Sequence, residues 1–172
     1  MLTETIISEA KRITEKFGTR DPFSICSAMG IRIRYMDLKG RIKGYFFYQS
    51  RISNIVIDES LSEPFARILA AHELGHAVLH KELAMLKGFA DLEVLDAYGS
   101  EYAPERDANI FAAELLLDDA ETIETLKEHT FFETASILNV PAALLDYKFY
   151  TLQKKGYSLT PLQIARADFL KD

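Results

Sequence analysis

The segment His72-Glu73-Leu74-Gly75-His76 holds two histidines four positions apart, with a glutamate directly after the first. In an α-helix, side chains at i and i+4 lie about 40° apart around the axis and about 6 Å apart along it. Two imidazoles placed in this way can bind one ion at about 2.0–2.1 Å each. The segment therefore predicts half of a metal site, although two unrelated histidines on a buried helix would give the same pattern.

Glu73 points about 60–100° away from the two histidines on such a helix. That direction makes its carboxylate a poor third ligand but leaves it close enough to hydrogen-bond a water on the metal. Bound Zn²⁺ lowers the pKa of water to about 7, and an adjacent carboxylate can accept the proton. We therefore predict that His72 and His76 bind zinc and that Glu73 is the general base.

A catalytic zinc site has three protein ligands and one open position. The single cysteine, Cys26, lies in an apolar segment and is expected to be a buried, inert thiol. The third ligand is then a carboxylate or a distant histidine, and a downstream helical segment offers four carboxylates: Glu101, Glu105, Asp107 and Glu114. Glu105 stands in the first turn, and Asn109 four positions later could hydrogen-bond a ligand from the same face. By this reasoning Glu105 and the other three together remain equally plausible.

The remaining histidines are not expected to bind the ion. His80 continues the row, but it lies about 12 Å from His72 along the helix axis, too far for one tetrahedral ion. A hydrogen bond or a place at the core edge suits His80 better, and His129 should lie at the surface. Tyr98 and Tyr102 are candidates to stabilise the oxyanion of a tetrahedral intermediate, but ordinary packing is the simpler expectation for both.

Apolar periodicity predicts the elements that must position these residues. Two helices open the chain, over residues 2–17 and from Asp21-Pro22 to Gly30. Three strands follow at residues 31–35, 44–48 and 54–58, and their short connections predict an antiparallel sheet. From residue 62 the pattern is helical: one helix carries the histidines to about residue 81, another runs from about 104 to 117, and three or four follow.

These elements predict an α+β fold, in which a small three-stranded antiparallel sheet packs on the metal helices and an all-helical C-terminal tail follows. The one plausible boundary, near Leu117-Asp118-Asp119-Ala120, would separate residues 1–118, with the metal site, from a helical subdomain of residues 119–172. Both parts are expected to form one compact unit. The strand at residues 54–58 is either a sheet edge that can accept an extended peptide or an interior strand packed on the metal helix.

The composition is that of an ordinary globular chain of 172 residues, 48% apolar and 27% charged. Its net charge of −6 argues against a protein whose affinity comes from covering phosphates with lysine and arginine. No apolar run approaches the roughly 20 residues of a membrane span, and the first residues lack a secretory pattern. We therefore expect a cytoplasmic protein without a membrane or nucleic-acid partner.

Two segments of the sequence resemble the motifs of the ImmA/IrrE metallopeptidases. The first covers residues 72–80, and the second, residues 105–117, is similar to the family's E-x-x-A-N-x-F-A-x-x-L-L-M-P. A weaker similarity extends through the strands and through Asn139–Lys148 in the tail. The sequence departs from the family at Leu117-Asp118, where Met-Pro is usual, but this position lies at the helix exit, away from the predicted ligands.

The resemblance implies zincin-like helices, with His72 and His76 as zinc ligands, Glu73 as general base and Glu105 as the third ligand. It also implies a regulatory protease that cuts a helix-turn-helix repressor encoded beside it and releases a silenced mobile element, such as a prophage, or a stress response. We expect the same of this chain, with that repressor as its protein partner.

Two rival interpretations come from other classes of protein. Residues 131–138 and 142–152, separated by Asn139-Val140-Pro141, could form a DNA-binding helix-turn-helix. The second of these helices sets Asp146 against Lys148 and lacks a basic face, so a helical hairpin packed on the core is the better expectation. A catalytically inactive protein that only binds the repressor is the other rival, and the presence of Glu73 argues against it.

Overall fold

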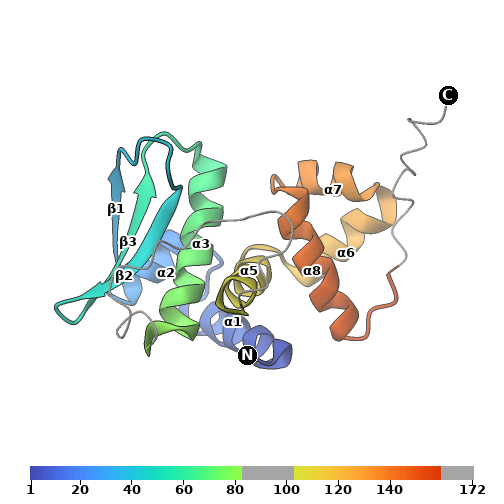
Figure 1. Ribbon diagram of the computed structural model, residues 1–172. Coiled ribbons are helices and arrows are strands. Elements are labelled where there is room, and N and C mark those ends of the chain that lie inside the picture. Colours follow the sequence, from blue (N-terminus) through green and yellow to red (C-terminus); the bar gives the residue numbers. More distant parts are fainter. Residues whose placement is uncertain (83–102, 160–172) are drawn as a thin grey trace.

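The computed structural model describes residues 1–82 and 103–159, which form seven helices and one three-stranded sheet. The sheet lies at one end, the C-terminal helices at the other, and α3 and α5 between them (Figure 1). In chain order the elements are α1 (Thr3–Phe17), α2 (Pro22–Ala28), β1 (Arg32–Met36), β2 (Gly44–Gln49), β3 (Ile52–Asp58), α3 (Glu63–Leu79), α5 (Ala103–Leu116), α6 (Asp119–Glu128), α7 (Phe131–Ile137) and α8 (Ala142–Lys154). The α+β class is thus confirmed. None of the described helices combines the length and apolarity that a membrane crossing requires.

The two N-terminal helices begin and end where their capping residues predict. Helix α1 buries Ile6, Ala10 and Ile13 and stops at Gly18, whose φ of 65° is a left-handed conformation that glycine adopts without strain. Asp21 caps α2 by accepting a hydrogen bond from the backbone N–H of Ser24 at 2.8 Å. These helices close the core beneath α3 and α5.

The sheet is mixed, with strand order β1-β3-β2, so the prediction of a fully antiparallel sheet is wrong. Strands β2 and β3 form an antiparallel hairpin, but β1 pairs parallel to β3, with Arg32 opposite Asn54. The reason lies in β3, whose Ile55, Val56 and Ile57 are all buried and therefore favour the centre of the sheet. The connection at residues 37–43 is long enough to carry the chain past the place that β3 then fills.

The central place of β3 also decides between two predictions for residues 54–58. These residues are the sheet interior, and the suggestion that they form an edge is wrong. The edges of this sheet are β1 and β2.

Helix α3 is buried on nearly all sides, because it lies between the sheet and α5 (Figure 1). Gly75 makes the contact with α5 possible: a Cβ at this position would stand 3.1 Å from the Cα of Ala108. Gly44 does the same for β2, because a Cβ there would lie 2.7 Å from Leu69 of α3. Both elements that flank α3 therefore approach it through a glycine.

Three helices follow α5 in the described part of the tail, in line with the prediction, and residues 160–172 lie outside it. Asp118 caps α6 by accepting from the backbone of Ala120 at 2.9 Å and also binds Arg20 at 3.0 Å. This explains what Asp118 does where the resemblance predicted a proline. Helix α6 begins at the predicted boundary, while the division into two domains stays a prediction.

Candidate metal centre

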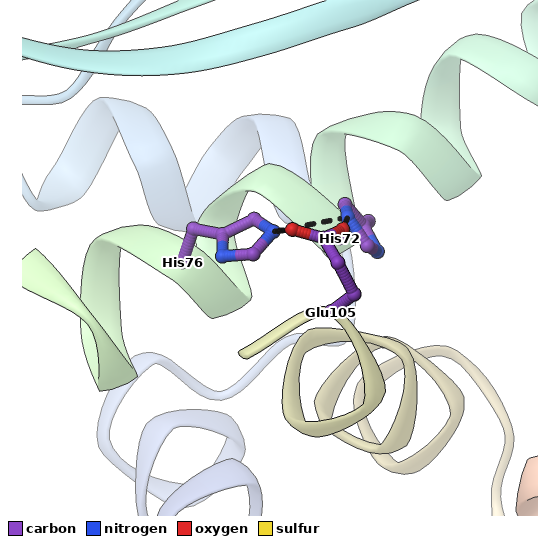
Figure 2. Close-up of side chains that lie close together, drawn as sticks. All are labelled: His72, His76 and Glu105. Atoms are coloured by element: carbon purple, nitrogen blue, oxygen red, sulfur yellow. Dashed lines mark hydrogen bonds and ion pairs between the residues drawn. The ribbon is translucent and has the colours of Figure 1, made fainter. Parts of the chain in front are cut away.

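Three side chains converge between α3 and α5 (Figure 2). His72 and His76 extend from α3, and Glu105 extends from the first turn of α5. The Nε2 atoms of the two histidines are 3.1 Å apart. The carboxylate oxygens of Glu105 lie 3.2 Å from Nε2 of His72 and 3.4 Å from Nε2 of His76. All three side chains are buried. The fold thus brings two histidines of one helix together with a carboxylate about thirty residues later in the sequence.

These separations fit a tetrahedral ion. Ligands at about 2.0–2.1 Å from a tetrahedral zinc stand about 3.3–3.4 Å from one another. Neither oxygen of Glu105 has a hydrogen-bond partner among the described residues, although the side chain is buried. A buried carboxylate left without donors is costly unless a cation binds it, so the donor set and its spacing suit a divalent metal.

Asn109 fixes the orientation of one of these rings. Its Oδ1 lies 2.9 Å from Nδ1 of His72 and can only accept, so Nδ1 must carry the proton. In its neutral form the ring then presents an unprotonated Nε2 to the centre, as metal-binding histidines do. The hydrogen bond expected from Asn109 is therefore present.

Electrostatics favour the metal-binding forms of His76 and Glu105. For His72 burial lowers the pKa, but the nearby Glu105 and Glu73 prevail and raise it, so a metal must displace a proton from this ring. Burial lowers the pKa of His76 to about 4, which keeps the ring neutral at ordinary pH. Burial opposes ionisation of Glu105, but the imidazoles of His72 and His76 outweigh it and lower the pKa of this carboxyl to about 2. A neutral imidazole and an ionised carboxylate are the protonation states required of ligands.

Glu73 lies in a different environment from Glu105. Its side chain is 0% exposed, and neither oxygen has a hydrogen-bond partner among the described residues. Burial raises the pKa of Glu73 to about 7, against the lowering effects of His72 and of the backbone N–H of Phe46. A carboxyl group with a pKa near neutrality can both accept and return a proton.

The other candidate residues lie apart from this centre. His80 is half-buried at the end of α3, which agrees with the expected place at the core edge, while its Nε2 lies 3.7 Å from Asp107, too far for a hydrogen bond. Glu114 is turned away and binds Lys148 at 3.0 Å. His129 ends α6 and is half-buried, which only partly fits the expected surface position.

Three other candidates lie outside the described residues: Glu101, Tyr98 and Tyr102. Cys26 is fully buried, as expected, and burial raises the pKa of its thiol to about 12, which disfavours the reactive thiolate.

Two features of the structure were not predicted. The first is the proximity of Phe46 on β2 to Glu73, which no local pattern announces. The second is the burial of Lys148, which is 0% exposed rather than displayed on a DNA-reading helix. Its spacing from Leu144, Leu145 and Leu152 places it on the apolar face of α8. This periodicity in the sequence could have predicted its burial. A helix whose central lysine points into the core is poorly suited to reading DNA.

Comparisons with known proteins agree with this geometry. The family model of the IrrE N-terminal-like domain, which is a peptidase family, matches residues 26–154. The chain is 31% identical over 147 residues to the uncharacterized immunity region protein 2 of Bacillus phage phi105, covering 84% of this chain and 89% of that protein. It is 29% identical over 143 residues to the metallopeptidase ImmA of Bacillus subtilis strain 168, covering 81% of each. The chain therefore belongs to the ImmA/IrrE family of metallopeptidases, as its two motif segments predicted.

Proposed function

We propose that this chain is a zinc-dependent endopeptidase in which His72, His76 and Glu105 hold the ion and Glu73 is the general base. The supporting observation is the convergence of three buried ligand side chains, in which the two Nε2 atoms lie 3.1 Å apart and each lies 3.2–3.4 Å from one oxygen of Glu105. Two imidazoles and one carboxylate suit zinc among the common divalent ions. When bound, the ion supplies Lewis acidity, which acidifies water and polarises the peptide carbonyl.

Glu73 moves the proton in this scheme. Its carboxylate takes a proton from the attacking water, whose oxygen bonds to the carbonyl carbon of the peptide. The same carboxyl then gives that proton to the amine nitrogen as the C–N bond breaks. A pKa of about 7, caused by burial, allows both steps at neutral pH.

The edge of β2 is the place where an extended substrate can bind. The backbone N–H of Asp58 donates to the carbonyl oxygen of Lys43 at 2.8 Å. This bond fixes which residues of β2 pair with β3 and which direct their backbone groups outward. Every second residue of β2 from Gly44 onward therefore directs its N–H and C=O away from β3. One of these residues is Phe46, which lies beside Glu73. An added strand would thus bring its peptide bonds to the general base.

We further propose that the substrate is a helix-turn-helix repressor protein and that cleavage takes place in the cytoplasm. The resemblance to the family suggests such a substrate. The phage relative is named an immunity region protein, and a regulatory target for this chain is consistent with that name.

The test is to mix the purified protein with the repressor encoded beside its gene. Zinc content is measured by mass spectrometry, and cleavage is followed by gel electrophoresis and peptide mapping. We expect one zinc ion per chain and cleavage that stops in Glu73→Gln, which is isosteric and keeps all three ligands. Cleavage by Glu73→Gln at the parental rate would refute the mechanism, and a metal-free protein that cleaves would refute the site.

A further inference from the structure

Charge is distributed unevenly along the chain. The sheet and its connections, residues 31–58, hold six lysines and arginines against two aspartates, a net charge of +4. Because the whole chain carries −6, the remaining residues carry −10. The sheet is therefore a positive region on an acidic protein.

The cations of this region are exposed and mostly unpaired. Five of them, which we call the basic sheet surface, are solvent-exposed: Arg32, Arg34, Arg41, Lys43 and Arg51. None of the five forms an ion pair with a carboxylate in residues 1–82 and 103–159. Of the two aspartates, Asp37 is paired with Lys39 and Asp58 is buried. A surface of one sign attracts ions of the other, whereas a merely solubilising surface mixes both signs.

The basic sheet surface adjoins the proposed substrate edge. Lys43 directly precedes β2, and Arg41 lies in the same connection. Arg51 stands in the hairpin at the opposite end of β2. Cations thus flank both ends of the strand whose outward backbone groups reach Glu73.

The two arginines of β1 extend the surface across the sheet. Arg32 and Arg34 are two residues apart, so they project from the same face of the strand. Strand β1 is one strand beyond β3, and the distance from β1 to β2 is about 10 Å. An extended segment added at the free edge of β2 would lie one strand farther out, about 14 Å from β1, so Arg32 and Arg34 act on it more weakly than the cations at the ends of β2 and mainly at low ionic strength.

We propose that the basic sheet surface selects an acidic segment of the substrate protein and holds it beside the β2 edge. This inference rests on the proposed peptidase function and adds the chemical class of the segment that is cut. A polypeptide fits better than a nucleic acid for two reasons. The β2 edge offers backbone pairing that only a peptide can use, and the charge of −10 elsewhere repels a long polyphosphate.

The binding test uses full-length Glu73→Gln protein loaded with zinc, so that no probe is consumed. The probes are fluorescein-labelled peptides of equal length, one rich in glutamate and one in which glutamine replaces the glutamates. Binding is followed by fluorescence anisotropy over a salt series. We expect the glutamate peptide to bind more tightly and to lose its advantage as salt rises.

Charge-reversal variants locate the binding. Arg41→Glu with Lys43→Glu should weaken binding of the glutamate peptide about tenfold. The matched control, Lys11→Glu with Lys127→Glu, makes the same change in net charge at exposed positions on α1 and α6 and should leave binding nearly unchanged. Circular dichroism confirms that all variants fold. Equal weakening by both pairs would overturn the proposal, because only net charge would then matter.

A second arm uses the parental enzyme with both peptides and separates this inference from the proposed function. Faster cleavage of the glutamate peptide by the parental enzyme supports the inference, provided that Arg41→Glu with Lys43→Glu slows this cleavage by raising KM. Equal cleavage of both peptides overturns it and leaves the peptidase intact. If the glutamate peptide binds and Arg41→Glu with Lys43→Glu weakens that binding, but neither the peptides nor the repressor are cleaved, the peptidase function is rejected. The proposal for the basic sheet surface then still stands. If single-stranded DNA of equal charge binds more tightly than the glutamate peptide and displaces it, the choice of a polypeptide is overturned.

Discussion

At the scale of single residues, two glutamates of the site differ because their surroundings differ. Two imidazoles face Glu105 and lower the pKa of its carboxyl to about 2, against the effect of burial. Glu73 lies one residue from His72 yet is fully buried, and burial together with the charge of Glu105 raises the pKa of its carboxyl to about 7. Carboxyl groups whose environments separate their pKa values divide the ligand and acid–base roles between them.

Asn109 offers a residue-scale prediction that does not depend on catalysis. Removing its Oδ1 in Asn109→Ala leaves Nδ1 of His72 without its acceptor at 2.9 Å, so the ring loses its preferred tautomer. We expect zinc affinity to fall about 10–100-fold, measured by competition with a fluorescent chelator. Asn109→Asp keeps an acceptor at this position and should restore most of the affinity. Equal zinc affinity in the alanine variant would show that the hydrogen bond does not orient the ligand.

At the scale of elements, the proposed metal site depends on how closely α3 and α5 approach. A methyl group in Gly75→Ala would meet the Cα of Ala108 at 3.1 Å and the ring of Phe111 at 3.3 Å. Since the backbone of α5 cannot yield as a side chain does, α5 must shift and carry Glu105 with it. We expect a loss of about 1–3 kcal/mol in the free energy of unfolding, together with weaker zinc binding. Alanine is the better helix former by about 1 kcal/mol, so a stabilised variant would contradict this packing.

The elements also show which features a sequence can reveal. The convergence of His72 and His76, with Glu73 beside them, follows from helical spacing alone, because the geometry within one helix is fixed locally, while their roles stay a proposal. Glu105 needed the family resemblance, since no local rule says which carboxylate of α5 faces α3. The position of β3 between β1 and β2 escaped prediction, because it depends on burial of both faces of β3 and not on the short connections.

At the scale of the whole molecule, a partly buried group of charges joins the C-terminal helices to the helix that carries Glu105. On α5, Glu114 binds Lys148 of α8 at 3.0 Å and Lys155, the residue that caps the end of α8, at 2.6 Å. Asp119, at the start of α6, binds the same two lysines. Removing one member would leave buried charge uncompensated, so the group stabilises this arrangement only as a complete set.

The last prediction concerns acid stability, and Asp119 is the residue that tests it. Burial opposes its ionisation, but hydrogen bonds from Lys148 and Lys155 prevail and hold the pKa of this carboxyl below its ordinary value. Because the folded pKa is lower than the unfolded one, its stabilising contribution is complete above about pH 5 and is lost as the pH falls through about 4 and below.

Asp119→Asn should therefore be less stable than the parent at neutral pH, and the difference in the free energy of unfolding should shrink as the pH falls to about 3. Urea titrations followed by circular dichroism at a series of pH values measure this difference. Glu121→Gln, at an exposed position on the same helix, serves as the control and should run parallel to the parent. A constant gap between parent and Asp119→Asn across the series would show that the two lysines do not stabilise the ionised carboxylate in the folded chain.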